Sequence, residues 1–360
     1  MKQTLLIVAL LLSSIALNAQ TSQKITAGKA SEYGLVYTLP ITALDVTVEA
    51  ELTSETPGEF SNYARKYLAD DSAIRETSKT ARIKSVIITP RGIPNPDNRW
   101  LAQFKSGSTP FMMLTPDGIP LAINSEDTDW IPTVNLPEPK AAGPSPLETD
   151  AARQAVTQEM ARSTSSSKRA ELAAQRIFEL REIRSDILSG QSDNTPPDGR
   201  ALQITLDNLA AQEAALTAMF LGTRSTSTVV QTVQIVPDSA SFSERVIARL
   251  SATDGLVDAD DLSGYPIKMS FQILEAASLP VNEKGELKKF PKGGVAYTIP
   301  GTAAVTISVN GSELTQKEIA LAQLGVTFGL DPALFTDKKE PSMVRFDSAT
   351  GAILLLGPAN

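Results

Sequence analysis

The sequence predicts an α+β protein in which two β-rich, sandwich-like domains flank a central antiparallel helical hairpin. Residues 165–222 carry the only long helical periodicity, in two segments separated by a proline- and glycine-containing turn at 196–199. Residues 44–52 instead alternate apolar and polar side chains, which is typical of a half-buried strand. Asn310-Gly311, between two further apolar segments, is a strong β-hairpin signal. Helical structure is therefore expected between two β-rich regions.

The N-terminal residues are typical of a secretory signal peptide. Lys2 supplies a short basic region, an apolar run extends over residues 5–17, and cleavage is expected after Ala19. Five prolines with few apolar neighbours indicate a linker further along. The expected organisation is a signal peptide (1–19), an N-terminal β-rich domain (20–129), a Pro-rich linker (130–146), the helical hairpin (147–222) and a C-terminal β-rich domain (223–360).

Secondary structure within these parts follows from the same periodicities. Shorter helices are expected over residues 56–68 and 147–160, and residues 244–250 fit either a helix or a strand. The expected strands are 44–52, 82–89, 99–105, 111–114, 119–123, 228–236, 267–274, 305–309, 313–319, 326–330, 343–346 and 352–356.

The composition excludes several classes of chemistry. The chain has neither histidine nor cysteine, so it can build no Ser-His-Asp or Cys-His triad, no thiolate metal site and no His-ligated zinc or iron. It also lacks the N-terminal cysteine that a lipoprotein needs. The net charge of −8 argues against a nucleic-acid partner, and no segment after residue 19 is apolar enough to span a membrane. We expect no cofactor, and a water-soluble protein that is periplasmic, secreted or associated with the cell surface.

The start of the main helical segment matches one catalytic pattern. Ser165 and Lys168 have the Ser-x-x-Lys spacing in which a lysine deprotonates a nucleophilic serine. The companion Lys-Thr-Gly motif is absent from the sequence. Small polar residues at the beginning of a helix are also typical of an N-cap, and we favour that interpretation.

The densest acidic cluster combines four aspartates, Asp254, Asp258, Asp260 and Asp261. A calcium site needs several oxygen ligands from one loop. The EF-hand pattern fails, however, because Ser263 stands where the required glycine would be. A solvated acidic turn is the favoured interpretation, and a calcium-dependent adhesive module is an alternative.

Trp100 and Trp130 are the only tryptophans, and aromatic residues total 5% of the chain. Polysaccharide-binding faces usually display several exposed rings, so packing in the core is the simpler account of Trp100. The sequence neither indicates nor excludes a glycan as the partner. A carboxylate-based glycan hydrolase is a further alternative, which requires two carboxyl groups roughly 5 to 9.5 Å apart across a cleft.

Charged residues interrupt the apolar stripes of the predicted hairpin. Arg184 stands in the first stripe and Glu213 in the second, and antiparallel packing about residues 190–199 places Glu213 opposite Arg176. A salt bridge that sets the register is the favoured interpretation, and a charged surface for a partner is the alternative. The candidate interaction residues are Arg176, Glu179, Arg181, Glu182, Arg184 and Glu213.

Two distant segments of the chain resemble each other. Residues 34–43 and 294–303 share Gly, Tyr, Thr, Pro, Thr and Ala at equivalent positions. A duplicated β-domain would explain the match and would make Tyr37 and Tyr297 equivalent packing anchors. The elements expected after each copy differ, so coincidence or a shared strand-entry turn stays open.

Several short segments of the chain form a recognisable set, and they are 37–40, 176–184, 188–190, 197–199, 209–216, 220–222 and 297–300. Together they resemble a domain-of-unknown-function family of exported Bacteroidota proteins. The match covers nearly all of the chain after residue 19. The resemblance implies export and one shared architecture, and it implies no activity, cofactor or ligand.

These observations together predict an exported binding or scaffolding protein that acts through protein contacts and is not an enzyme. The identity of the partner and the oligomeric state do not follow from the sequence.

Overall fold

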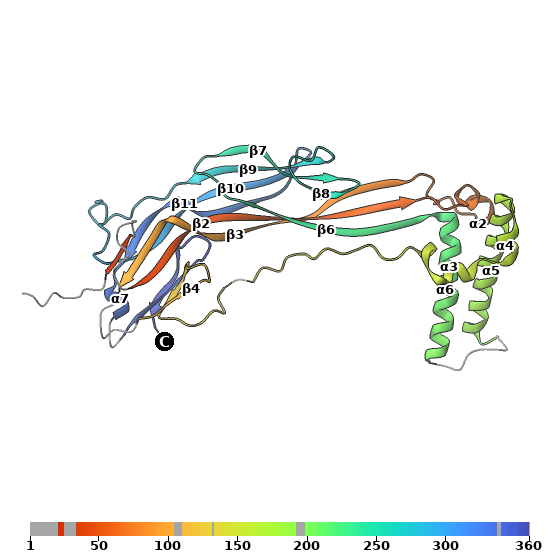
Figure 1. Ribbon diagram of the computed structural model, residues 1–360, viewed down its shortest axis with the longest axis horizontal. Coiled ribbons are helices and arrows are strands. Elements are labelled where there is room, and N and C mark those ends of the chain that lie inside the picture. The colour runs from red at the N-terminus through yellow and green to blue at the C-terminus, as the bar shows by residue number, and fades with distance from the viewer. Residues whose placement is uncertain are drawn as a thin grey trace, which may run out of the picture.

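The computed structural model describes residues 21–24, 34–103, 110–131, 133–191, 199–336 and 340–359. The predicted signal peptide (1–19) lies outside these residues. The chain is mostly β, with 45% of residues in strands and 23% in helices. Its strands form three antiparallel sheets. All helices except one short one at Ala333–Thr336 lie together at one end of an elongated β body (Figure 1).

The predicted fold class is therefore wrong, because no central hairpin separates two β-rich domains. Two of the three sheets combine strands that precede the helical segment with strands that follow it. The physical reason is that a strand's alternating pattern shows that it pairs, but not with which partner. Strands far apart in the sequence here share one sheet, which places the helices of residues 61–68 and 146–221 at one end of the molecule (Figure 1).

Sheet A is built around two long antiparallel strands. Its order is β1 (Thr21–Lys24), β3 (Ser78–Gln103), β2 (Leu35–Thr56) and β6 (Thr223–Ile235). Residues 82–89 and 99–105 were predicted as separate strands, but β3 is continuous through the prolines between them. Pro90 and Pro94 stay paired with β2. Because β1 covers only residues 100–103 of β3, both prolines lie where the other side of the strand is an open edge, the place that proline tolerates.

Sheet C packs on sheet A. Its order is β11 (Ser312–Leu330), β10 (Val295–Val309), β9 (Tyr265–Glu275), β7 (Phe242–Ser251) and β8 (Gly255–Val257), so residues 244–250 form a strand. Asn310 and Gly311 both have positive φ, as a two-residue hairpin turn requires, and this hairpin prediction is confirmed. The core shared by the two sheets includes Leu44, Val46, Val48, Ile247, Ile267, Phe271, Val305, Ile307 and Leu321.

Sheet B joins two short hairpins that are far apart in the sequence. Its order is β13 (Ile353–Pro358), β12 (Ser342–Phe346), β5 (Pro120–Ile123) and β4 (Met112–Leu114). The short helix α7 (Ala333–Thr336) precedes β12. A separate core lies between sheet B and the first residues of β2 and β10, and it contains Tyr37, Leu39, Ile123, Val295, Leu330, Phe335, Val344 and Phe346.

The two matching segments begin β2 and β10 and lie against each other. The backbone N–H of Ala296 donates to Tyr37 Oη at 2.8 Å. Thr38 and Thr298 each donate a backbone N–H to a glycine carbonyl in the turn of a sheet B hairpin, Gly118 at 2.9 Å and Gly351 at 3.0 Å. The surroundings of the two segments therefore match, which supports the duplication hypothesis.

An irregularity of the strand register also occurs in both long hairpins. In each, an advance of two positions along the first strand corresponds to an advance of five positions along the second. The bounding pairs are Thr38↔Arg99 with Pro40↔Pro94, and Ile299↔Val326 with Gly301↔Leu321. The two tyrosines differ, however, because Tyr37 is buried whereas Tyr297 is half-buried with its ring edge against Phe328. They are not equivalent packing anchors.

The helices form a helical head with its own core. Its elements are η1 (Ser61–Tyr63), α2 (Ala64–Leu68), η2 (Pro146–Glu148), α3 (Asp150–Ala155), α4 (Gln158–Arg162), α5 (Ser166–Ser189) and α6 (Arg200–Leu221). The helix predicted over residues 147–160 is divided, because Thr157 caps a new helix at Met160 N–H. The shared core contains Phe60, Ala64, Met160, Ala173, Ile177, Leu180, Leu216 and Phe220.

Two glycines allow the head to pack tightly on the ends of β2 and β6. A Cβ on Gly58 would lie 2.2 Å from the carbonyl oxygen of Met219, and one on Gly222 would lie 2.5 Å from that of Thr56. Gly222 also has φ +84°, a conformation that favours glycine. The backbone N–H of Phe60 donates to Met219 O at 2.7 Å across the same junction.

No helix among the described residues is long and apolar enough to cross a membrane.

Candidate interaction groove on the helical head

An open groove of about 440 Å³ runs along the contact between α5 and α6. We call it the arginine groove. Three of the six predicted interaction residues line it. The lining residues are Arg181, Arg184, Ala210, Glu213, Ala214, Thr217, Ala218, Leu221 and Gly222.

Glu213 is the centre of the polar contacts in this groove. Arg181 Nε lies 2.7 Å from Glu213 Oε1, and Arg184 Nη1 lies 2.7 Å from Glu213 Oε2. The Glu213 side chain is 14% exposed, whereas those of Arg181 and Arg184 are 45% and 37% exposed. One nearly buried carboxylate therefore holds two guanidinium groups that face solvent.

This arrangement carries a net positive charge and spare hydrogen-bond donors. Each guanidinium has five N–H donors in a planar fork, and one carboxylate cannot use all ten. A second anionic group entering the groove would meet donors already oriented by Glu213. Planar bidentate binding of a carboxylate is what arginine does best. The groove can therefore bind an acidic side chain or a free carboxylate.

The predicted opposition of Glu213 and Arg176 is wrong. Arg176 Nη1 instead bonds Glu179 Oε2 within α5 at 3.1 Å. Arg176 Nε is buried with no hydrogen-bond partner among the described residues. Heptad spacing identifies the apolar face of each helix but leaves the offset between two helices undetermined, and here the offset brings Glu213 to Arg181 and Arg184.

The remaining predicted residues lie outside the groove lining. Glu179 is exposed and bonds Arg176, and Glu182 is exposed on α5. Sequence reasoning also missed the small residues that form the floor. Their signal was present in the spacing of four, three and four along α6, which aligns Ala210, Ala214, Thr217 and Leu221.

The Ser-x-x-Lys pattern is a helix cap, as favoured from the sequence. Ser165 Oγ accepts the backbone N–H of Lys168 at 3.4 Å, and Lys168 Nζ lies 3.2 Å from Glu171 Oε1. A Ser-Asp-Asn sequence occurs at 192–194, outside the described residues.

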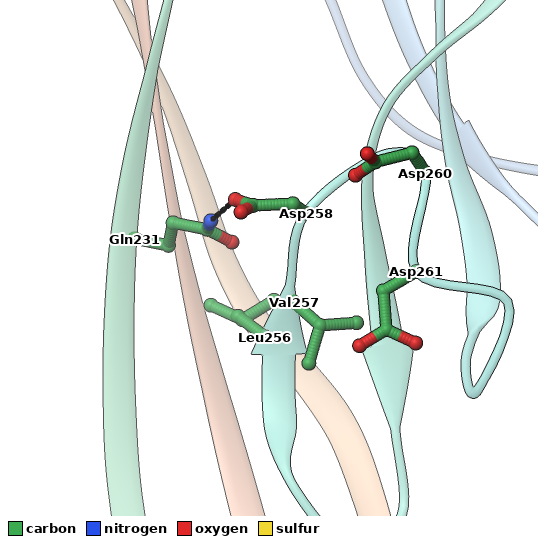
Figure 2. A pocket seen from close by; sticks show the side chains of 6 residues that line it. All are labelled: Gln231, Leu256, Val257, Asp258, Asp260 and Asp261. Atoms are coloured by element: carbon green, nitrogen blue, oxygen red, sulfur yellow. Dashed lines mark hydrogen bonds between the residues drawn. The ribbon is translucent and has the colours of Figure 1, made fainter.

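The acidic cluster forms a second, separate hollow of about 490 Å³, lined by Gln231, Leu256, Val257, Asp258, Asp260 and Asp261 (Figure 2). Gln231 Nε2 donates to Asp258 Oδ1 at 3.2 Å, and Asp261 points in a different direction (Figure 2). The backbone N–H of Ser263 and then its side chain lower the pKa of Asp261. Asp254 instead accepts from Thr253 Oγ1 at 2.6 Å.

Asp254, Asp258 and Asp261 therefore each accept a hydrogen bond from a neighbouring residue. Among the described residues, no group of three or more Asp or Glu side chains is placed to hold a metal ion. The structure offers no support for a calcium site.

The tryptophans are both engaged by neighbouring side chains. Trp100 stacks on Phe290, with ring centroids 5.4 Å apart, and its Nε1 donates to Asn98 Oδ1. Arg345 lies over the ring of Trp130 at 5.8 Å. Neither tryptophan lines the acidic hollow, so the structure does not combine an aromatic ring with those carboxylates.

The fold and groove define a class of protein: an elongated, mostly β body that carries a helical head with a charged groove. The chain belongs to the family described as domain of unknown function DUF4831, whose family model matches residues 33–354. The resemblance to a domain-of-unknown-function family is thereby confirmed, while a Bacteroidota origin stays a prediction. Neither the curated proteins nor the solved structures contain a match to the chain.

Proposed function

We propose that this protein is an exported binding or scaffolding protein that acts through protein contacts at the arginine groove and carries out no catalysis. The observation that carries the proposal is the pair of solvent-facing guanidinium groups held on the carboxylate of Glu213. They present fixed donors beside an apolar floor in an open groove.

The chemistry of the groove favours an acidic protein segment as the partner. The groove has a local positive charge on a chain whose net charge is −8. Small side chains on α6 leave room beside Arg181 and Arg184 for a carboxylate and its own stem. Such a contact between exposed charges weakens as salt is added, because mobile ions screen it.

Export is the second part of the proposal. It is supported by Lys2, the apolar run over residues 5–17 and Ala19, the pattern of a cleaved signal peptide. The absence of cysteine makes the chain independent of the redox state of the compartment. We place the mature protein in the periplasm, or secreted or at the cell surface. N-terminal sequencing of the protein from the cell envelope should then begin at or near Gln20, and an intact Met1 would contradict export.

The partner contact can be tested by photo-crosslinking in the native envelope. A photo-reactive amino acid replaces Thr217 in the groove, and the captured protein is identified and purified. Binding of the purified partner is then compared between the unchanged chain and the double variant Arg181→Glu/Arg184→Glu. We expect the variant to lose binding and the unchanged chain to bind more weakly as salt increases.

Arg153→Glu provides the matched control. Arg153 lies on α3 of the same head, is exposed, and pairs with Asp150 outside the arginine groove. It should leave binding unchanged. Equal binding by the double variant and the unchanged chain would overturn the proposed role of the groove.

A further inference from the structure

The last strand of sheet B has an unusual edge. β13 pairs with β12 on one side and, among the residues that the structure describes, is the outermost strand of its sheet. Leu354, Leu355 and Leu356 are 57%, 43% and 45% exposed. Successive residues of a strand point to opposite faces, so both faces of β13 present leucine to solvent.

The other sheet edges among the described residues are protected in ways that β13 is not. β1, β4 and β8 have only three or four residues each. The part of β3 that β1 leaves uncovered carries lysines, arginines and prolines, and the part of β7 that β8 leaves uncovered carries Glu244 and Arg245. β6 carries Arg224 and is partly bridged at Thr228 by Lys140, and β11 carries Glu313, Lys317 and Glu318. Short length and charge are the usual protections of an edge strand against pairing with another chain. β13 has six residues and no charged side chain.

The unpaired backbone N–H and C=O groups of an edge strand form their best hydrogen bonds with another strand. These outward N–H and C=O groups form a template for the addition of a β-strand. A strand that covers β13 must also place apolar side chains opposite its three leucines and must bring no charged side chain. β13 itself has this composition.

Antiparallel pairing of two copies of β13 about a twofold axis satisfies this requirement. With Leu355 at the axis, Leu355 faces its counterpart and Leu354 faces Leu356 of the other copy. Every central cross-strand pair is then Leu with Leu, and such apolar pairs stabilise a sheet. A charged residue near the axis would face its own copy, and β13 has none.

The neighbouring charge is already neutralised within one chain. Arg345 of β12 is opposite Leu355 in the sheet, and its Nη2 lies 2.7 Å from Asp127 Oδ2. Two chains with a net charge of −8 repel each other over most of their surfaces, and β13 offers a neutral strip for contact.

We propose that β13 is the contact surface for a second copy of this chain, which joins the two B sheets into one continuous sheet across a twofold axis. Such a dimer is isologous and closed. It leaves the arginine groove on each head free, because that groove is lined by residues of the helical head and its junction at Gly222. The dimer would therefore present two grooves.

Light scattering and sedimentation at micromolar concentrations test the dimer. The unchanged chain should be dimeric, and Leu355→Lys should weaken dimerisation roughly 100-fold, since two lysines would face each other at the axis. Leu262→Lys is the matched control, because Leu262 is 81% exposed in the loop between β8 and β9. It should leave the dimer intact.

Single cysteines give a second measurement that does not depend on the lysine variant. The chain has no cysteine of its own, so oxidation of Leu355→Cys reports only on that position. We expect a covalent dimer for Leu355→Cys and none for Leu262→Cys. A monomeric unchanged chain would overturn the proposal. So would a dimer that Leu355→Lys leaves intact, or a monomer whose β13 binds only extended peptides.

Discussion

The β body and the helical head differ in the sequence distance between the residues that contact each other. In the body, β2 (Leu35–Thr56) pairs with β6 (Thr223–Ile235), and β5 (Pro120–Ile123) pairs with β12 (Ser342–Phe346). In the head, most of the core comes from residues 146–221, with one short contribution from residues 60–68. The body is therefore assembled through distant pairings and the head largely through near ones.

This difference leads us to expect two units of unequal stability. Elements with many distant, buried contacts open only with the whole domain, whereas smaller peripheral units open separately. The head meets the body through a junction at Gly58 and Gly222. We expect the head to unfold first and the three sheets to unfold together.

The largest expected effects come from deleting one large core side chain in each unit. Phe271→Ala in the body and Phe220→Ala in the head each remove a buried ring, and each should cost about 3–5 kcal/mol because a cavity remains. Hydrogen exchange followed by mass spectrometry should show opening of the sheets for Phe271→Ala and of the helices alone for Phe220→Ala. Equal loss of protection in the sheets of both variants would mean that head and body are one cooperative unit.

A smaller effect is expected where the two matching segments meet. Tyr37→Phe removes the hydroxyl that accepts the buried N–H of Ala296 at 2.8 Å. A buried donor that loses its acceptor costs about 1–3 kcal/mol, so the free energy of unfolding of the body in denaturant should fall by that amount. Tyr265→Phe, on an exposed tyrosine of β9, is the control and should change nothing. An unaltered stability of Tyr37→Phe would show that this contact does not hold the segments together.

A smaller change still is expected in the head for Glu213→Ala. The substitution leaves Arg181 and Arg184 close together without their shared carboxylate. Partly exposed ion pairs contribute about 1 kcal/mol or less, so the helical melting transition should shift down by a few degrees. Glu171→Ala breaks the exposed pair with Lys168 and should shift it less. If Glu213→Ala melts like the unchanged chain, Glu213 has no structural role in the head.

The smallest effect is a dependence of body stability on pH. Hydrogen bonds from Lys84 and then Ser85 lower the pKa of Glu49 from its usual 4.5. The hydrogen bond to the Glu49 carboxylate in turn raises the pKa of Lys84. Because the pKa of Glu49 is lower in the folded state, its stabilisation is present above about pH 4.5 and is lost as the pH falls through the folded pKa. Denaturant titrations of Glu49→Gln should show lower stability at neutral pH and a weaker pH dependence below 4.5. Parallel curves for the two chains would contradict this account.

The sequence predicted part of the candidate site and not its geometry. Arg184 and Glu213 were predicted because each interrupts an apolar stripe, and Arg181 because it belongs to the charged residues of the first helix. Both patterns can be recognised in one helix at a time. The pairing of Glu213 with Arg176 was wrong because the offset between two helices depends on how all their side chains fit together. The residues of α6 that form the floor could not be assigned to a groove from the sequence, because the groove exists only where α5 packs beside α6.

Local chemistry was decided by the sequence itself. The missing histidine and cysteine exclude whole classes of catalysis, the Ser165 cap follows from one side chain and one turn of helix, and Asn310-Gly311 makes its hairpin by two positive φ angles. Each depends on residues only a few positions apart. Tertiary structure alone decided that β6 returns along β2, that β12 joins β5, and that the helices stand at one end, since alternating strands accept many partners until the buried faces of the whole chain are matched.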